Sequence, residues 1–462
     1  MTTVVAERPT PGLPRPYEFP DFRRDRLPNG LDVLTVDVPG RPLVSALLVM
    51  PTGAVDEPPE LAGAAVLAAR ALTEGTQSHD AVALVEATER LGASLHADAG
   101  WDATTIGVDV PVERLEPALE LAAEVALTPT FPASEVDRLR EERLNDILQA
   151  RADPRRRVEE ALIETIYTRE SPYHRPSAGV RETVERLDAG VLRAAYAGAA
   201  NPVGAALIVA GELGDADVRR LAERLFGSWS GGQAAGQRTV EAEPANRSRR
   251  VRVVHRPGSV QTEIRIGHIG RPRRIADFHA LSVTGAILGG LFNSRLNRKL
   301  REEKGYTYGA TASFDLRRGA GPFAARAAVQ TAVTVPAILD AIAELEAIRS
   351  APVTTAELTA ARDFLVGVFP LRFETPGPIV GALSGVVIHG LPDDELARYR
   401  ERIEAVTAED VLRTAEANVR PSELQIVLVG DADAFGADLE AAPIGEITIE
   451  RDEPAVAPAE RA

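Results

Sequence analysis

The sequence GASLHADAGWDATTIGVDVPVERLEPALELAAEV, residues 92–125, has a counterpart in GATASFDLRRGAGPFAARAAVQTAVTVPAILDAIAEL, residues 309–345. Each stretch reads as two alternating β-strands followed by an amphipathic helix. Each also opens on a glycine, Gly92 in the first and Gly309 in the second. The chain therefore contains two related segments of mixed α and β structure.

Further matches along the chain keep nearly the same spacing as these two glycines. Residues 184–202, VERLDAGVLRAAYAGAANP, match residues 403–421, IEAVTAEDVLRTAEANVRP. The apolar strands LIVAG and IVLVG, which follow these matches, end at Gly211 and Gly430. A nearly constant offset over several elements indicates duplication of a long unit. We expect an α+β fold of two homologous halves, each a mainly antiparallel sheet packed on helices, in a clam-like pair.

Composition changes set the predicted boundaries. The N-terminus is rich in proline, the segment after the first half is rich in Gly, Ala, Gln and charge, and the C-terminus has few large apolar residues. The resulting division is a disordered N-terminus (1–23), an N-terminal domain (24–229), a linker (230–250), a C-terminal domain (251–440) and a tail (441–462).

Charge and composition exclude several classes of function. The net charge of −16 disfavours nucleic acids and anionic membranes as partners. Because the chain has no cysteine, disulfides, thiolate catalysis and Cys-ligated zinc are ruled out. No run approaches the roughly 18 apolar residues of a membrane-spanning helix, and the Pro-rich N-terminus lacks a signal peptide's apolar core. We expect a cytoplasmic protein.

The two halves and the segment LPNGLDVLTVDVPGRPLVSALLVMPTGAVDEPPELAG, residues 27–63, resemble the pitrilysin/insulinase-like metallopeptidases. The likeness is greatest to the short-chain group that includes the mitochondrial processing peptidase subunits. It extends from about Arg24 to about Gly430.

The resemblance places a zinc site in the helix that follows, but its residues are missing. Catalytic members carry H-x-x-E-H there, two histidine ligands and a glutamate that is the general base. The matching positions here are Val66, Ala69 and Arg70, and the position of the third ligand is Asp146. Asp146 alone cannot hold zinc, since such a site needs three protein ligands. We expect no cofactor in this chain, and zinc in a partner subunit.

The histidines offer no evident replacement. No two of the seven are spaced i, i+4, so we interpret them as surface or satisfied core residues. A zinc site assembled from distant positions stays open but is disfavoured. The seven are His79, His96, His174, His255, His268, His279 and His389.

Arg70 has two interpretations that the sequence leaves open. Its guanidinium either neutralises Asp146 in place of the metal or extends into solvent without a partner. In both interpretations, the helix that carries Arg70 is the remnant of a metal site.

A second element carries the remaining chemistry. In LGGLFNSRLNRKLREEKGYTYGA, residues 288–310, Arg301 and Tyr308 match a family Arg and Tyr at the same spacing. The resemblance implies that both reach a substrate held at the zinc of the opposite half and stabilise its tetrahedral oxyanion. The alternative is a solvated helix face with a tyrosine at a strand start. Gly289 and Gly290 lie where the family's non-catalytic subunits carry a glycine-rich substrate loop, although a close-packed turn explains them equally well.

The sequence therefore predicts a pseudoenzyme of the insulinase-like, or pitrilysin, family. It would be the zinc-less subunit of a heterodimeric metallopeptidase in peptide processing, completing the active chamber and supplying Arg301 and Tyr308. Its partners would be a zinc-bearing homologue and peptide substrates, with no nucleic acid and no membrane. The alternative is a structural or peptide-binding homologue with no role in catalysis.

Overall fold

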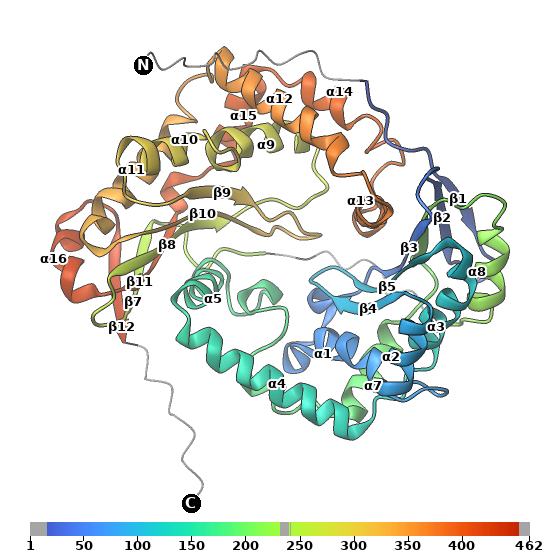
Figure 1. The fold of residues 1–462 in the computed structure, drawn as a ribbon. Coiled ribbons are helices and arrows are strands. Elements are labelled where there is room, and N and C mark those ends of the chain that lie inside the picture. Colours follow the sequence, from blue (N-terminus) through green and yellow to red (C-terminus); the bar gives the residue numbers. More distant parts are fainter. Residues whose placement is uncertain (1–15, 232–239, 241, 452–462) are drawn as a thin grey trace, which may run out of the picture.

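The computed structural model describes residues 16–231, 240 and 242–451, which form two six-stranded sheets (Figure 1). The first sheet has the order β1-β2-β6-β3-β5-β4. The only parallel pair within it is β2 with β6. Its strands are β1 (Arg23–Arg26), β2 (Asp32–Asp37), β3 (Leu43–Met50), β4 (Ser94–Ala99), β5 (Thr104–Pro111) and β6 (Ala206–Gly211).

The second sheet repeats this topology in the order β12-β7-β11-β8-β10-β9. The strands β7, β11, β8, β10 and β9 correspond to β2, β6, β3, β5 and β4, and only the outermost strand differs in direction. This confirms the predicted fold class and the duplication. The strands are β7 (Arg250–His255), β8 (Gln261–Ile269), β9 (Ala310–Phe314), β10 (Pro322–Gln330), β11 (Gln425–Gly430) and β12 (Glu446–Arg451).

Helices cover the outer face of each sheet and bury its main core. The helices of the first half are α1 (Ala64–Ala71), α2 (Ala81–Arg90), α3 (Leu115–Leu127), α4 (Ala133–Ala152), α5 (Pro154–Ile166), α6 (Arg181–Val184), α7 (Ala189–Ala199) and α8 (Val218–Phe226). The helices of the second half are α9 (Phe278–Gly285), α10 (Arg295–Asn297), α11 (Thr334–Ala347), α12 (Thr355–Leu371), α13 (Pro376–His389), α14 (Tyr399–Glu404), α15 (Ala408–Asn418) and α16 (Ala432–Ala441).

One helix of each half packs on the sheet of the other half. The central strands β6 and β11 are buried along their whole length, so both of their faces need an apolar cover. Helix α5, from the first half, packs on β8 and β11, and α13, from the second half, packs on β3 and β6 (Figure 1). This reciprocal exchange joins the two halves through apolar contacts.

The structure departs from the predicted boundaries near both ends. Phe19, assigned to the disordered N-terminus, is only 5% exposed, and its ring meets Phe373 edge-on at a centroid distance of 5.0 Å. Strand β12, assigned to the tail, pairs in parallel with β7 and completes the second sheet. Part of the predicted linker, 232–239 and 241, lies outside the described residues. None of the described helices has the length and apolar character needed to cross a bilayer.

Candidate functional site

The three degenerate motif positions lie on α1, which packs against α4. Ala69 is fully buried, whereas Arg70 is exposed at the end of the helix. Arg70 Nη2 donates to Glu142 Oε2 at 2.9 Å. Glu142 lies on α4, one helical turn before Asp146, so the helix presents a different carboxylate to Arg70. The predicted pair of Arg70 with Asp146 is therefore wrong, and so is the alternative of an unpaired Arg70.

Asp146 instead binds two other arginines. Arg156 donates from Nη1 and Nη2 to the two carboxylate oxygens at 2.8 and 3.0 Å, and Arg143 Nη1 donates to Oδ2 as well. The hydrogen bonds from Arg156 lower the pKa of the Asp146 carboxyl, so it is ionised at neutral pH. Arg143 is fixed in turn by the carbonyl oxygens of Ala178 and Gly179, at 2.9 and 3.1 Å. Two guanidinium groups thus bind the carboxylate that the resemblance places at the position of the third zinc ligand.

The sequence contained a signal for this arrangement. Arg143 and Asp146 are spaced i, i+3 on one helix, which brings two side chains together. The contact of Arg156 with Asp146 could not be predicted from the sequence, because it depends on how α5 folds back on α4 after Pro154.

A cavity of about 1050 Å³ lies beside this cluster. Its walls come from α4 and α5, from residues 176–178 and 307–309, and from β8, β9 and β10. Six arginines line it: Arg143, Arg155, Arg156, Arg265, Arg317 and Arg326. Tyr308 lines it too, and this side chain is 94% exposed.

The structure separates the two residues of the predicted Arg–Tyr element. Arg301 is not among the residues that line the cavity. Its guanidinium carbon lies 4.5 Å from the ring centroid of Phe292, within the range of a cation–π contact. Tyr308 is therefore at the cavity in this conformation, whereas Arg301 is not.

Gly289 lies near the end of a π-helical turn, Ala286–Gly290, that packs on β9. A Cβ atom at Gly289 would lie 2.0 Å from the backbone nitrogen of Ala312, which no real contact permits. At Gly290 the nearest atom to such a Cβ would be 3.3 Å away. Close packing therefore accounts for Gly289 without a substrate.

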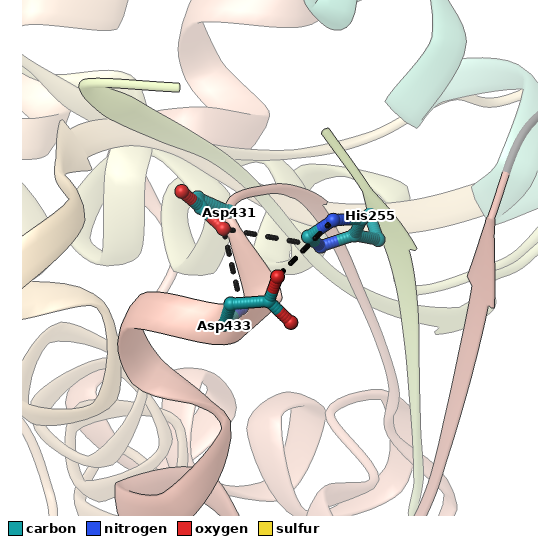
Figure 2. A group of neighbouring side chains, drawn as sticks. All are labelled: His255, Asp431 and Asp433. Atoms are coloured by element: carbon teal, nitrogen blue, oxygen red, sulfur yellow. Dashed lines mark hydrogen bonds and ion pairs between the residues drawn. The ribbon is translucent and has the colours of Figure 1, made fainter. Parts of the chain in front are cut away.

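Among the described residues, one group of histidine and carboxylate side chains is close enough to hold a metal ion: His255, Asp431 and Asp433 (Figure 2). His255 Nδ1 lies 3.9 Å from Asp431 Oδ1, and Nε2 lies 3.7 Å from Asp433 Oδ2. Sequence reasoning missed this group, because the parallel pairing of β7 with β11 brings together residues that are far apart in the chain.

The hydrogen bonds of His255 argue against a metal there. Its Nδ1 accepts the backbone N–H of Ala432 at 3.1 Å, so the proton of the neutral ring is on Nε2. A metal-bound histidine instead donates through its second nitrogen. In the first sheet the equivalent residue, Asp37, accepts the N–H of Leu213 at 3.0 Å. Both residues thus anchor the turn after the central strand.

Two family profiles match the chain. The one described as insulinase (peptidase family M16) matches residues 32–178, and the one described as peptidase M16 inactive domain matches residues 186–365. A relative named uncharacterized zinc protease, from Mycobacterium tuberculosis (strain H37Rv), is 26% identical over 394 residues, covering 84% of this chain and 89% of that protein. A protein of the same description from Streptomyces coelicolor is 25% identical over 406 residues, or 85% of this chain and 86% of that protein.

Two solved structures share the fold. A peptidase M16 inactive domain from Pseudomonas fluorescens superposes with a TM-score of 0.81 at 24% identity, covering 89% of this chain and 98% of that one. A protease from Helicobacter pylori gives a TM-score of 0.80 at 18% identity, with 90% and 100% covered.

Proposed function

This chain belongs to the insulinase family of peptidases, M16, and we propose that it is the zinc-less, non-catalytic subunit of a heterodimeric metallopeptidase. A separate zinc-bearing homologue supplies the metal and the general base. This chain completes the chamber that holds the peptide and offers hydrogen-bond donors to the scissile carbonyl oxygen.

One observation carries the proposal: the fold of a peptidase is retained while its zinc site is replaced by arginines. Val66 and Ala69 have no metal-binding atom, and Asp146 is held by Arg143 and Arg156. A zinc ion at this place would meet two positive charges. The residues present therefore do not fit the metal, and catalysis needs a second chain that has it.

The exposed Tyr308 supports a contribution to catalysis. Its phenol lines the cavity, and the described residues form no hydrogen bond with it. A free O–H at the wall of a substrate cavity is available to the oxyanion that forms when zinc-bound water attacks a peptide. It stabilises charge without being a nucleophile.

Arg301 has the second role in this proposal. In the isolated chain its guanidinium rests on Phe292, whose side chain is 68% exposed. An exposed cation–π contact is worth only about 0.5–1 kcal/mol. Binding of a peptide and the partner can therefore draw Arg301 from Phe292 toward the substrate at small cost.

The test is reconstitution with a zinc-bearing M16 homologue from the same cell. Each chain is assayed alone and in an equimolar mixture on unfolded peptides, with zinc measured in every sample. We expect no cleavage by this chain, little by the homologue, and a large increase in the mixture. A complex that forms but has the activity of the homologue alone would instead favour the structural or peptide-binding role.

A further inference from the structure

The wall of the cavity carries more positive than negative charge, although the whole chain has a net charge of −16. Four carboxylates line it beside the six arginines: Glu159, Glu160, Glu263 and Asp315. Asp146, behind Arg143 and Arg156, brings the number of carboxylates to five. Burial raises the pKa of the Glu160 carboxyl above its usual value.

Part of this charge is already neutralised. Arg265 and Arg326 lie directly opposite each other on β8 and β10, a placement that is unfavourable for two like charges. Glu159 Oε1 accepts from both, at 2.7 and 3.0 Å, and Glu263 also binds Arg265 at 3.1 Å. Arg317 binds Asp315 at 2.9 Å. These arginines fix the shape of the wall, but their charges are balanced.

The arginine that is not neutralised by a direct partner in the described part of the chain lies at the start of α5. Arg156 shares Asp146 with Arg143, and its side chain is 41% exposed. Arg155 is exposed, and its guanidinium has no hydrogen bond or ion pair with the described residues. Both arginines occupy the first turn of a 13-residue helix, beside Asp153, whose side chain caps the helix by accepting the N–H of Arg155 at 2.9 Å. An anion at this end of the cavity thus meets the guanidinium of Arg155, which has no partner among the described residues, next to Arg156, whose Nη1 and Nη2 already donate to Asp146.

The geometry points to a peptide carboxylate as the ligand of Arg155 and Arg156. The cavity selects peptides that carry an acidic side chain or a free C-terminus at the position that lies against the start of α5. The planar fork of a guanidinium matches a carboxylate better than any other group of a peptide. This inference rests on the proposed function only in taking the ligand to be a peptide.

The test measures binding by the full chain alone, through the fluorescence anisotropy of short labelled peptides. One peptide contains several glutamates, a second has glutamine at these positions, and each is made with a free and with an amidated C-terminus. We expect replacement of the carboxylates to weaken binding about 10-fold at low salt, as for loss of a charged hydrogen bond. The difference should shrink at high ionic strength. If the change from glutamate to glutamine weakens binding, the cavity recognises an acidic side chain. If amidation weakens binding, it recognises the free C-terminus.

Two variants locate the site. Arg155→Gln should remove most of the preference for carboxylates without affecting the fold, because the side chain is exposed and has no partner among the described residues. Arg413→Gln is the matched control, an exposed arginine that binds Asp277 and Asp410. It should bind the peptides as the wild type does.

Equal affinity for all four peptides would overturn the inference, and so would an unchanged preference in Arg155→Gln. Neither result depends on the partner, because cleavage is not measured. Conversely, a failure of reconstitution with selective binding intact would overturn only the proposed catalytic role.

Discussion

Arg318 Nη2 donates to Asp56 Oδ1 at 2.6 Å, although 262 residues separate them in the sequence. The backbone N–H of Arg318 also donates to Asp102 Oδ2 at 2.8 Å. The three side chains are between 9 and 15% exposed. The adjacent Arg317 stacks on Trp101, with its guanidinium carbon 4.8 Å from the ring centroid. The loop between β9 and β10 thus joins the second sheet to the first half through hydrogen bonds, an ion pair and a cation–π contact.

Replacing Arg318 with methionine should destabilise the fold, because two largely buried carboxylates lose their positive partner. Breaking a buried ion pair by removal of one side costs about 3–5 kcal/mol. The free energy of unfolding at neutral pH, from urea titration, measures the loss. Arg413→Met, in an exposed cluster, should leave the midpoint unchanged.

The loss in Arg318→Met should depend on pH. Burial already raises the pKa of Asp102 above its usual value. The folded state then binds a proton more readily than the unfolded state, so this group contributes less stability as pH rises through the folded pKa. The deficit should therefore shrink as pH falls from neutral into the acid range. An equal deficit over that range would show that Asp102 is not the uncompensated charge.

Restoring the zinc motif should not restore zinc binding. A variant with Val66→His, Ala69→Glu, Arg70→His and Asp146→Glu has the ligands, but Arg143 and Arg156 still oppose a cation there. We expect elemental analysis after dialysis to find little zinc. Adding Arg156→Ala should increase the zinc retained, with circular dichroism as the check that each variant folds. Stoichiometric zinc in the wild-type chain would contradict the pseudoenzyme interpretation.

Tyr308→Phe should leave folding and assembly intact, since the side chain is 94% exposed. In the reconstituted enzyme kcat should fall about 10²–10³-fold, as for loss of one oxyanion donor elsewhere. Substrate affinity should change much less, because the donor acts mainly in the transition state. Wild-type turnover by a normally assembled complex would leave this chain only a scaffold.

Arg301→Lys should also lower kcat in the reconstituted enzyme. An ammonium has no planar fork with which to meet the oxyanion, although the positive charge remains. The steady-state rate of the mixture measures this, and the melting temperature of the chain alone should be nearly unchanged. A variant with full activity would restrict the catalytic contribution to Tyr308.

Gly289→Ala should lower the melting temperature, because the new Cβ would lie 2.0 Å from the Ala312 nitrogen and force the backbone apart. Such overpacking costs about 1–3 kcal/mol. Gly285→Ala is the matched control, since its Cβ would have no atom within 4 Å. It lies in helix α9 and should be stabilising by about 0.5–1 kcal/mol. Equal melting temperatures for the two variants would show that packing does not require Gly289.

The sequence by itself determined the architecture. Alternating strands, amphipathic helices and the matching strand ends at Gly211 and Gly430 indicate two copies of one α+β unit. Such local patterns reflect periodicity, which each segment carries without its neighbours. The sequence also showed directly that Val66, Ala69 and Arg70 stand where the resemblance predicts the zinc motif, because the identity of a residue needs no coordinates.

Only the tertiary structure decided which side chains meet. Arg70 binds Glu142 and not Asp146, because the crossing of α1 and α4 sets which carboxylate lies within reach. Arg156 reaches Asp146 only because α5 folds back on α4. The exchange of α5 and α13 between the halves likewise follows from the need to cover both faces of β6 and β11. Partners distant in sequence are fixed by the packing of whole elements, and no local pattern records that packing.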